Sequence, residues 1–134
     1  MTSGPEQRYV PIETPLGELR GRDAIYLDEV SIGEGVLTLR GELNGRLLSQ
    51  PRESYVGYAL TFNGLIAFSM TTLEASAEFG ASSFDEVLHS GWLRNIRNNV
   101  EPDVLSCDGL RHFFIRTYDD VFSVICREYE LLLN

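Results

Sequence analysis

Three neighbouring side chains have the types found in a nucleophilic relay. Cys107 could supply a thiolate, His112 could accept its proton, and Asp108 could orient the imidazole. Such side chains occur together by chance in many proteins, and their spacing along the sequence does not define a geometry. The glycine-rich, zinc-binding and nucleophile motifs of common enzyme classes do not occur in the sequence. We therefore predict that the protein is not an enzyme.

A second group of reactive side chains, Tyr118 with Asp119 and Asp120, lies between two apolar runs. Adjacent carboxylates can bind a cation or work as an acid–base pair. Aspartate is also common in turns, because its carboxylate accepts hydrogen bonds from nearby backbone amides. The sequence favours a structural turn at this position, with contacts to an ion or to a partner as alternatives.

Metal binding has little support in the sequence. The two histidines, His89 and His112, lie on different predicted elements, and neither has a second ligand three or four residues away. The two cysteines, Cys107 and Cys126, are expected to be free thiols, because no secretion signal precedes them. We predict that the protein needs no metal and no other cofactor.

The segment 98–110 is rich in turn residues and acidic residues. It shows no regular spacing of apolar side chains, and a connection of this length is typical of a mobile or functional loop. We predict that three of its carboxylates contact a partner: Glu101, Asp103 and Asp108. The group at 118–120 is a secondary candidate. The loop and that group should lie at opposite ends of a strand over 111–118, so they should not form one surface.

Alternating apolar residues predict that most of the chain is β-structure. An Asn63-Gly64 pair between two such runs is a strong hairpin signal, because both residues accept positive φ. About six strands in hairpin order favour an antiparallel, β-rich α+β fold, either a sandwich or a partly closed barrel. The predicted strands cover 25–32, 36–43, 55–62, 65–73, 111–118 and 121–133.

One main helix is predicted over 84–96. Ser83 and Glu86 have the spacing of a capping box, in which each side chain bonds to the other residue's backbone amide. Gly91 is the weak point, because glycine in a helix interior costs roughly 1 kcal/mol relative to alanine. The apolar residues share one face at helical spacing, and we expect this face to pack on the sheet: Phe84, Leu88, Trp92 and Ile96.

The first part of the chain differs in composition from the rest. Three prolines precede Leu16, so we predict a loosely ordered lead-in over 1–23, with a short extended piece at 9–12. A single domain is expected over 24–134. The sequence has neither the apolar core of a signal peptide nor an apolar run long enough to span a membrane. A cytoplasmic location is therefore expected.

The charge balance limits the classes of partner. The 134-residue chain has 20 acidic and 11 basic residues and a net charge of −9. Binding of nucleic-acid phosphates needs clustered basic side chains, and an anionic membrane surface would repel this chain. We therefore expect neither nucleic acid nor membrane as a partner. A basic protein is the expected partner, because complementary charge accelerates association.

Two segments carry a resemblance: SSFDEVLHSGWL (82–93) and RHFFIRTYDDVFSVICREYELLL (111–133). They resemble small acidic bacterial proteins of the immunity type, which belong to polymorphic toxin systems. The resemblance implies a cytoplasmic, non-enzymatic protein that binds and neutralises a basic toxin, and it assigns no catalytic residue. The alternatives are a β-rich domain that binds a small molecule or a peptide, and a small hydrolase. The oligomeric state does not follow from the sequence.

Overall fold

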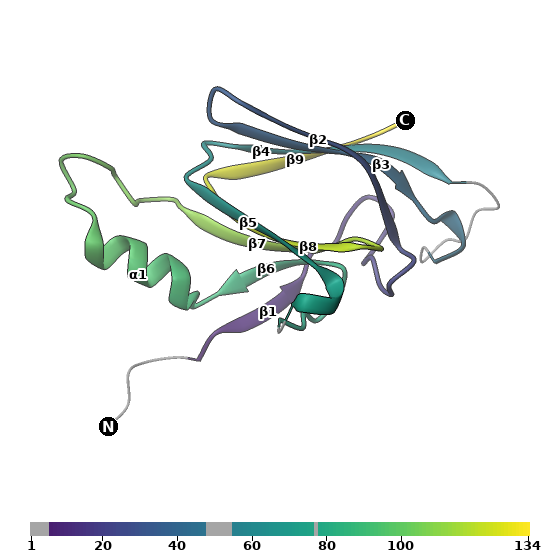
Figure 1. Cartoon of the computed structure of the whole chain (residues 1–134), viewed down its shortest axis with the longest axis horizontal. Helices are drawn as coiled ribbons and strands as arrows, with labels where there is room; N and C mark the ends of the chain where they lie inside the picture. Colours follow the sequence, from purple (N-terminus) through teal and green to yellow (C-terminus); the bar gives the residue numbers. More distant parts are fainter. Residues whose placement is uncertain (1–5, 48–54, 77) are drawn as a thin grey trace.

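A four-stranded and a five-stranded antiparallel sheet lie face to face, and one helix lies on the outer side of the five-stranded sheet (Figure 1). The computed structural model describes residues 6–47, 55–76 and 78–134. The four-stranded sheet has, in spatial order, β2 (Ile25–Gly33), β3 (Val36–Leu43), β4 (Val56–Asn63) and β9 (Glu128–Leu133). The five-stranded sheet has, in spatial order, β1 (Arg8–Pro11), β6 (Phe84–Leu88), β7 (Arg111–Arg116), β8 (Asp120–Cys126) and β5 (Ala67–Thr72). The helix is α1 (Gly91–Asn99).

The main core fills the space between the two sheets. Alternate residues of β4 are buried, as the period of a strand with one covered face requires. The ring of Phe113 on β7 lies 5.8 Å from Phe62 on β4 and 5.1 Å from Tyr129 on β9. The antiparallel, β-rich α+β class is therefore confirmed. In the described residues the two sheets remain separate and do not close into a barrel.

The predicted hairpin at Asn63-Gly64 is wrong. Strands lie on both sides of it, but β4 pairs with β3 and β9, whereas β5 pairs with β8 in the other sheet. The run predicted as one strand over 121–133 likewise divides at Arg127 into β8 and β9. At both places the chain passes from one sheet to the other. These two places are adjacent, because the Arg127 amide donates a 3.0 Å hydrogen bond to the Asn63 carbonyl. Pairing with distant strands outweighs the local preference of Asn-Gly for a tight turn.

The predicted helix over 84–96 begins too early. Residues 84–88 form β6, which pairs with β1 and β7 and has buried residues on both of its faces. A strand covered on both faces loses the simple alternation of apolar and polar residues, so its pattern is easily confused with a helix. Helix α1 starts only at Gly91, where glycine is the first helical residue and does not interrupt the helix.

The single apolar face predicted for that helix does not exist. Phe84 belongs to β6 and lies in the core between the sheets. Trp92 and Ile96 instead pack around Leu93 on the outer face of the five-stranded sheet. Trp92 is half-buried rather than fully buried.

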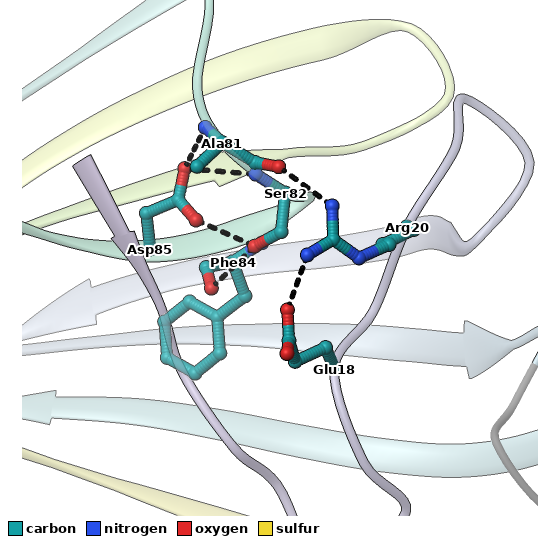
Figure 2. A network of polar contacts seen from close by, with 6 residues as sticks. All are labelled: Glu18, Arg20, Ala81, Ser82, Phe84 and Asp85. Carbon is teal, nitrogen blue, oxygen red and sulfur yellow. Dashed lines mark hydrogen bonds and ion pairs between the residues drawn. The ribbon is translucent and has the colours of Figure 1, made fainter.

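Ser83 and Glu86 form no capping box: the Ser83 hydroxyl donates to the Gly21 carbonyl, and Glu86 pairs with Arg111. Their neighbours Ser82 and Asp85 organise a loop ahead of β6 (Figure 2). The buried carboxylate of Asp85 accepts hydrogen bonds from the amides of Ala81 (2.7 Å) and Ser82 (3.2 Å) and from the Ser82 hydroxyl (2.5 Å). The Arg20 guanidinium donates to the Ala81 carbonyl at 3.1 Å and pairs with Glu18. This network ties an early segment of the chain to the five-stranded sheet.

The described part of the segment 1–23 is integrated into the domain rather than loosely ordered. β1, which matches the extended piece expected at 9–12, pairs with β6 along its whole length. Ile12 and Leu19 are buried in the core. Pro11 is tolerated because β1 is an edge strand, where a missing amide proton need not break a hydrogen-bonded ladder. Residues 1–5 lie outside the described residues.

Candidate functional site

The turn between β6 and α1 sets the position of the helix. His89 adopts a left-handed conformation (φ 55°), which few residues other than glycine accept. Ser90 follows as the N-cap, and its hydroxyl oxygen accepts a 3.0 Å hydrogen bond from the Leu93 amide. The chain thereby turns back after β6, and Leu93 packs against Leu110 and Ile125 of the sheet.

A buried histidine joins this turn to the sheet. The Nδ1 atom of His112 lies 2.7 Å from the Ser90 hydroxyl, and its Nε2 atom lies 2.8 Å from the Ser123 hydroxyl. Burial lowers the pKa of His112 to about 4, so the ring is neutral at pH 7. A neutral imidazole has one donor and one acceptor nitrogen, so one serine donates to the ring and the other accepts from it.

This arrangement does not supply the relay considered for Cys107. Both ring nitrogens of His112 are engaged by serine hydroxyls, so neither is free to take a proton from the thiol. Asp108 is exposed, and its contacts run through its backbone amide and carbonyl rather than its carboxylate. His112 therefore serves as a polar bridge between α1, β7 and β8.

Two cavities flank His112. The first, which we name the arginine cavity, has a volume of about 350 Å³ and lies between α1 and the strands β6 and β7. Three arginines are among its lining residues: Arg94 and Arg97, which are exposed, and Arg111. Glu86 is the one carboxylate among the described residues that line it, and Arg111 binds both oxygens of that carboxylate at 2.7 and 3.0 Å.

The second cavity, of about 340 Å³, lies on the outer face of the five-stranded sheet. Its lining includes His112 and Ser123, with Trp92 from α1. The Tyr9 hydroxyl donates a 2.5 Å hydrogen bond to Glu78 there. Burial, followed by the bonded Glu78 carboxylate, raises the pKa of Tyr9, so this phenol stays protonated.

The predicted partner-binding carboxylates all lie on the surface. Glu101, Asp103 and Asp108 are exposed, and none of the three carboxylates pairs with another described residue. The loop that carries them is nevertheless fixed. Its chain reverses at Glu101, whose carbonyl accepts from the amides of Val104 (2.9 Å) and Leu105 (3.1 Å).

The secondary candidates lie at the other end of β7 and have structural roles. The Tyr118 ring stacks on Tyr26 at 5.4 Å, and the Arg22 guanidinium lies 4.3 Å from the centre of the Tyr118 ring. The carbonyls of Asp119 and Asp120 accept 2.8 Å hydrogen bonds from the amides of Leu73 and Thr117, respectively. The predicted turn between the two strands is confirmed, and it does not join the acidic loop in one surface.

Within the described residues, no group of three or more histidine, cysteine, aspartate or glutamate side chains is arranged to hold a metal ion. Both cysteines are free thiols, and Cys126 is buried. None of the helices in the described part of the chain has the length and the apolar character needed to cross a bilayer.

Sequence reasoning missed the residues around the two cavities. These residues, Ser90, Ser123, Arg94 and Arg97, belong to no recognisable sequence motif. The alternation of side chains between the two faces of β7 and β8 could have predicted the contact between His112 and Ser123. In the observed hairpin register His112 lies opposite Ile125, on the same face as Ser123, and that register follows from the turn at 117–119.

The chain was compared with protein-family models, with curated proteins and with solved structures, and none of these comparisons gives a match.

Proposed function

We propose that this protein is a non-enzymatic binding module for a basic protein, and that the acidic loop over 100–110 is its binding surface. In the form that the sequence resemblance suggests, it is a cytoplasmic immunity protein that binds and neutralises a basic toxin. The net charge of −9 favours such a partner, because opposite charges steer the two proteins together.

The fixed shape of the acidic loop is the observation that carries this function. The Arg127 guanidinium donates to the carbonyls of Ser106 (2.9 Å) and Asp108 (2.8 Å), which holds the loop against the crossing between β8 and β9. Leu110 at the end of the loop is buried. A loop that is already ordered loses little conformational entropy when a partner binds.

The side chains on this loop suit a protein surface. Val104 is 81% exposed and follows Asp103 directly, so an apolar contact is available beside the unpaired carboxylates. An apolar centre with charged groups around it is the common arrangement of a protein interface. The carboxylates are solvated, so they act mainly on the rate of association and on its salt dependence.

A capture experiment with three baits tests this function. The baits are the wild-type protein, a loop variant with Glu101→Arg, Asp103→Arg and Asp108→Arg, and a control with Glu42→Arg, Glu74→Arg and Glu130→Arg. The control residues are exposed and lie outside the loop, and both triple variants change the net charge equally. Each bait is presented to a lysate of the native host at low salt.

We expect one basic protein to bind the wild-type and control baits and to be lost from the loop variant. Measured at increasing salt, its association rate with wild type should fall more steeply than its rate with the loop variant. Equal retention by all three baits would contradict the assignment of the loop. A wild-type bait that retains no basic protein would contradict the function itself.

A further inference from the structure

We propose that the arginine cavity binds a small organic anion through the guanidinium groups of Arg94 and Arg97. The ligand class is a compact molecule with a carboxylate or phosphate group and an apolar body. This inference goes beyond the proposed protein-binding function and uses none of the acidic-loop carboxylates.

The local charge of the cavity is opposite to that of the whole protein. Acidic residues outnumber arginines by 20 to 11 in the chain, whereas arginines outnumber carboxylates among the described residues that line this cavity. Arg94 and Arg97 make no ion pair with another described residue. Arg111 neutralises Glu86, the one carboxylate among the described lining residues. Arg94 and Arg97 are exposed, and the described lining holds no further carboxylate that could pair with them.

The two free guanidinium groups come from one side of a fixed helix. Residues three apart on a helix are neighbours on its surface, so Arg94 and Arg97 reach the cavity together. The helix is held by Leu93, which is buried against the sheet, and by its Ser90 cap. A planar guanidinium group binds carboxylate or phosphate oxygens with two parallel hydrogen bonds, so a pair of them suits such an anion.

The other lining residues and the volume of the cavity indicate the polarity and the size of the rest of the ligand. Leu93 and Leu110 contribute apolar surface beside the arginines. The volume of about 350 Å³ lies at the lower end of the range for small-molecule sites. A nucleic acid would fit poorly, because its extended phosphate chain would also meet the acidic groups of this chain.

The probes for this site are inorganic phosphate, pyrophosphate, citrate and phenyl phosphate. Each is titrated into the ¹⁵N-labelled protein, and amide chemical shifts report where it binds. The test variant is Arg94→Gln with Arg97→Gln. The control variant is Arg20→Gln with Arg40→Gln, because both of these arginines are exposed and lie outside the cavity lining. Circular dichroism checks that both variants are folded.

We expect saturable shifts at residues 86–97 and 110–112 with at least one probe, and tighter binding of phenyl phosphate than of phosphate. The test variant should bind at least about tenfold more weakly, because charge-assisted hydrogen bonds are lost. The control should bind like wild type. Shifts that do not saturate, that lie outside the cavity, or that persist in the test variant would overturn the assignment. The acidic-loop variant should retain anion binding, so the two proposals can fail separately.

Discussion

His112 shows how burial controls the charge of a single residue. It is 4% exposed, and both its ring nitrogens are satisfied by serine hydroxyls rather than by a carboxylate. A charged ring would lose its water on burial, so burial lowers the pKa of His112 to about 4. The same bridge fixes the position of Ser90, and through it the start of α1.

The stability of the protein should depend on this titration. Unfolded His112 has a pKa of about 6.5. Between about pH 6.5 and 4 the unfolded state therefore binds a proton that the folded state does not bind, and stability falls as the pH is lowered. From pH 7 to 4.5 we expect wild type to lose about 2 kcal/mol more of its free energy of unfolding than His112→Gln. Urea unfolding at several pH values measures this difference. Equal losses in wild type and His112→Gln would show that His112 does not titrate as described.

At the scale of elements, the edge strands of the two sheets differ in how well they are protected against pairing with a strand of another molecule. β1 is short and contains Pro11, and β9 carries Glu128 and Glu130. β2 contains acidic residues and an irregularity in its pairing between Leu27 and Glu29. β5 has neither charge nor proline, and its pairing with β8 is regular. An edge strand of this kind offers free backbone groups to another strand.

We predict that β5 is the main site of self-association at high protein concentration. Met70 on β5 is 56% exposed, and a lysine there would place a charge on the edge. Met70→Lys should slow aggregation on heating, as measured by light scattering, and leave the melting temperature nearly unchanged. The matched control is Leu132→Lys on β9, where a side chain with 55% exposure lies near existing charges. Similar aggregation rates for the two variants would contradict this role of β5.

At the scale of the whole molecule, the corner at Asn63 and Arg127 connects the two sheets twice. β4 leads into β5 and β8 leads into β9 at adjacent positions. Gly64 in this corner has a φ of 66°, and a Cβ atom added to it would lie 2.7 Å from the Arg127 side chain. The same Arg127 side chain holds the acidic loop, so the corner links the sandwich to the proposed binding surface.

Gly64→Ala should therefore disturb both stability and the acidic loop. We expect the free energy of unfolding to fall by about 2 kcal/mol, because alanine is strained at positive φ and displaces Arg127. Amide hydrogen exchange in the loop 100–110 should become faster. Gly33→Ala is the control, since no atom lies within 4 Å of its added Cβ. If Gly64→Ala is destabilised but amide exchange in the loop is unchanged, the claim that this corner holds the acidic loop is contradicted.

The sequence by itself determined the β-rich composition, the strands with alternating residues and the turn at Asp119, because these depend on neighbours along the chain. It also identified Glu101, Asp103 and Asp108 as carboxylates on a loop. Their exposure is now observed, whereas their role in binding remains a prediction.

Tertiary structure decided where each strand pairs. The Asn63-Gly64 pair has the local preference of a hairpin, yet β5 joins β8 because that pairing completes the five-stranded sheet. Residues 84–88 have a helical pattern, yet they become a strand because β1 and β7 satisfy their backbone on both sides. The arginine cavity and the contact between His112 and Ser90 arise in the same way. Their residues come from α1 and its N-cap, β6 and β7, and no local signal records which elements a chain will bring together.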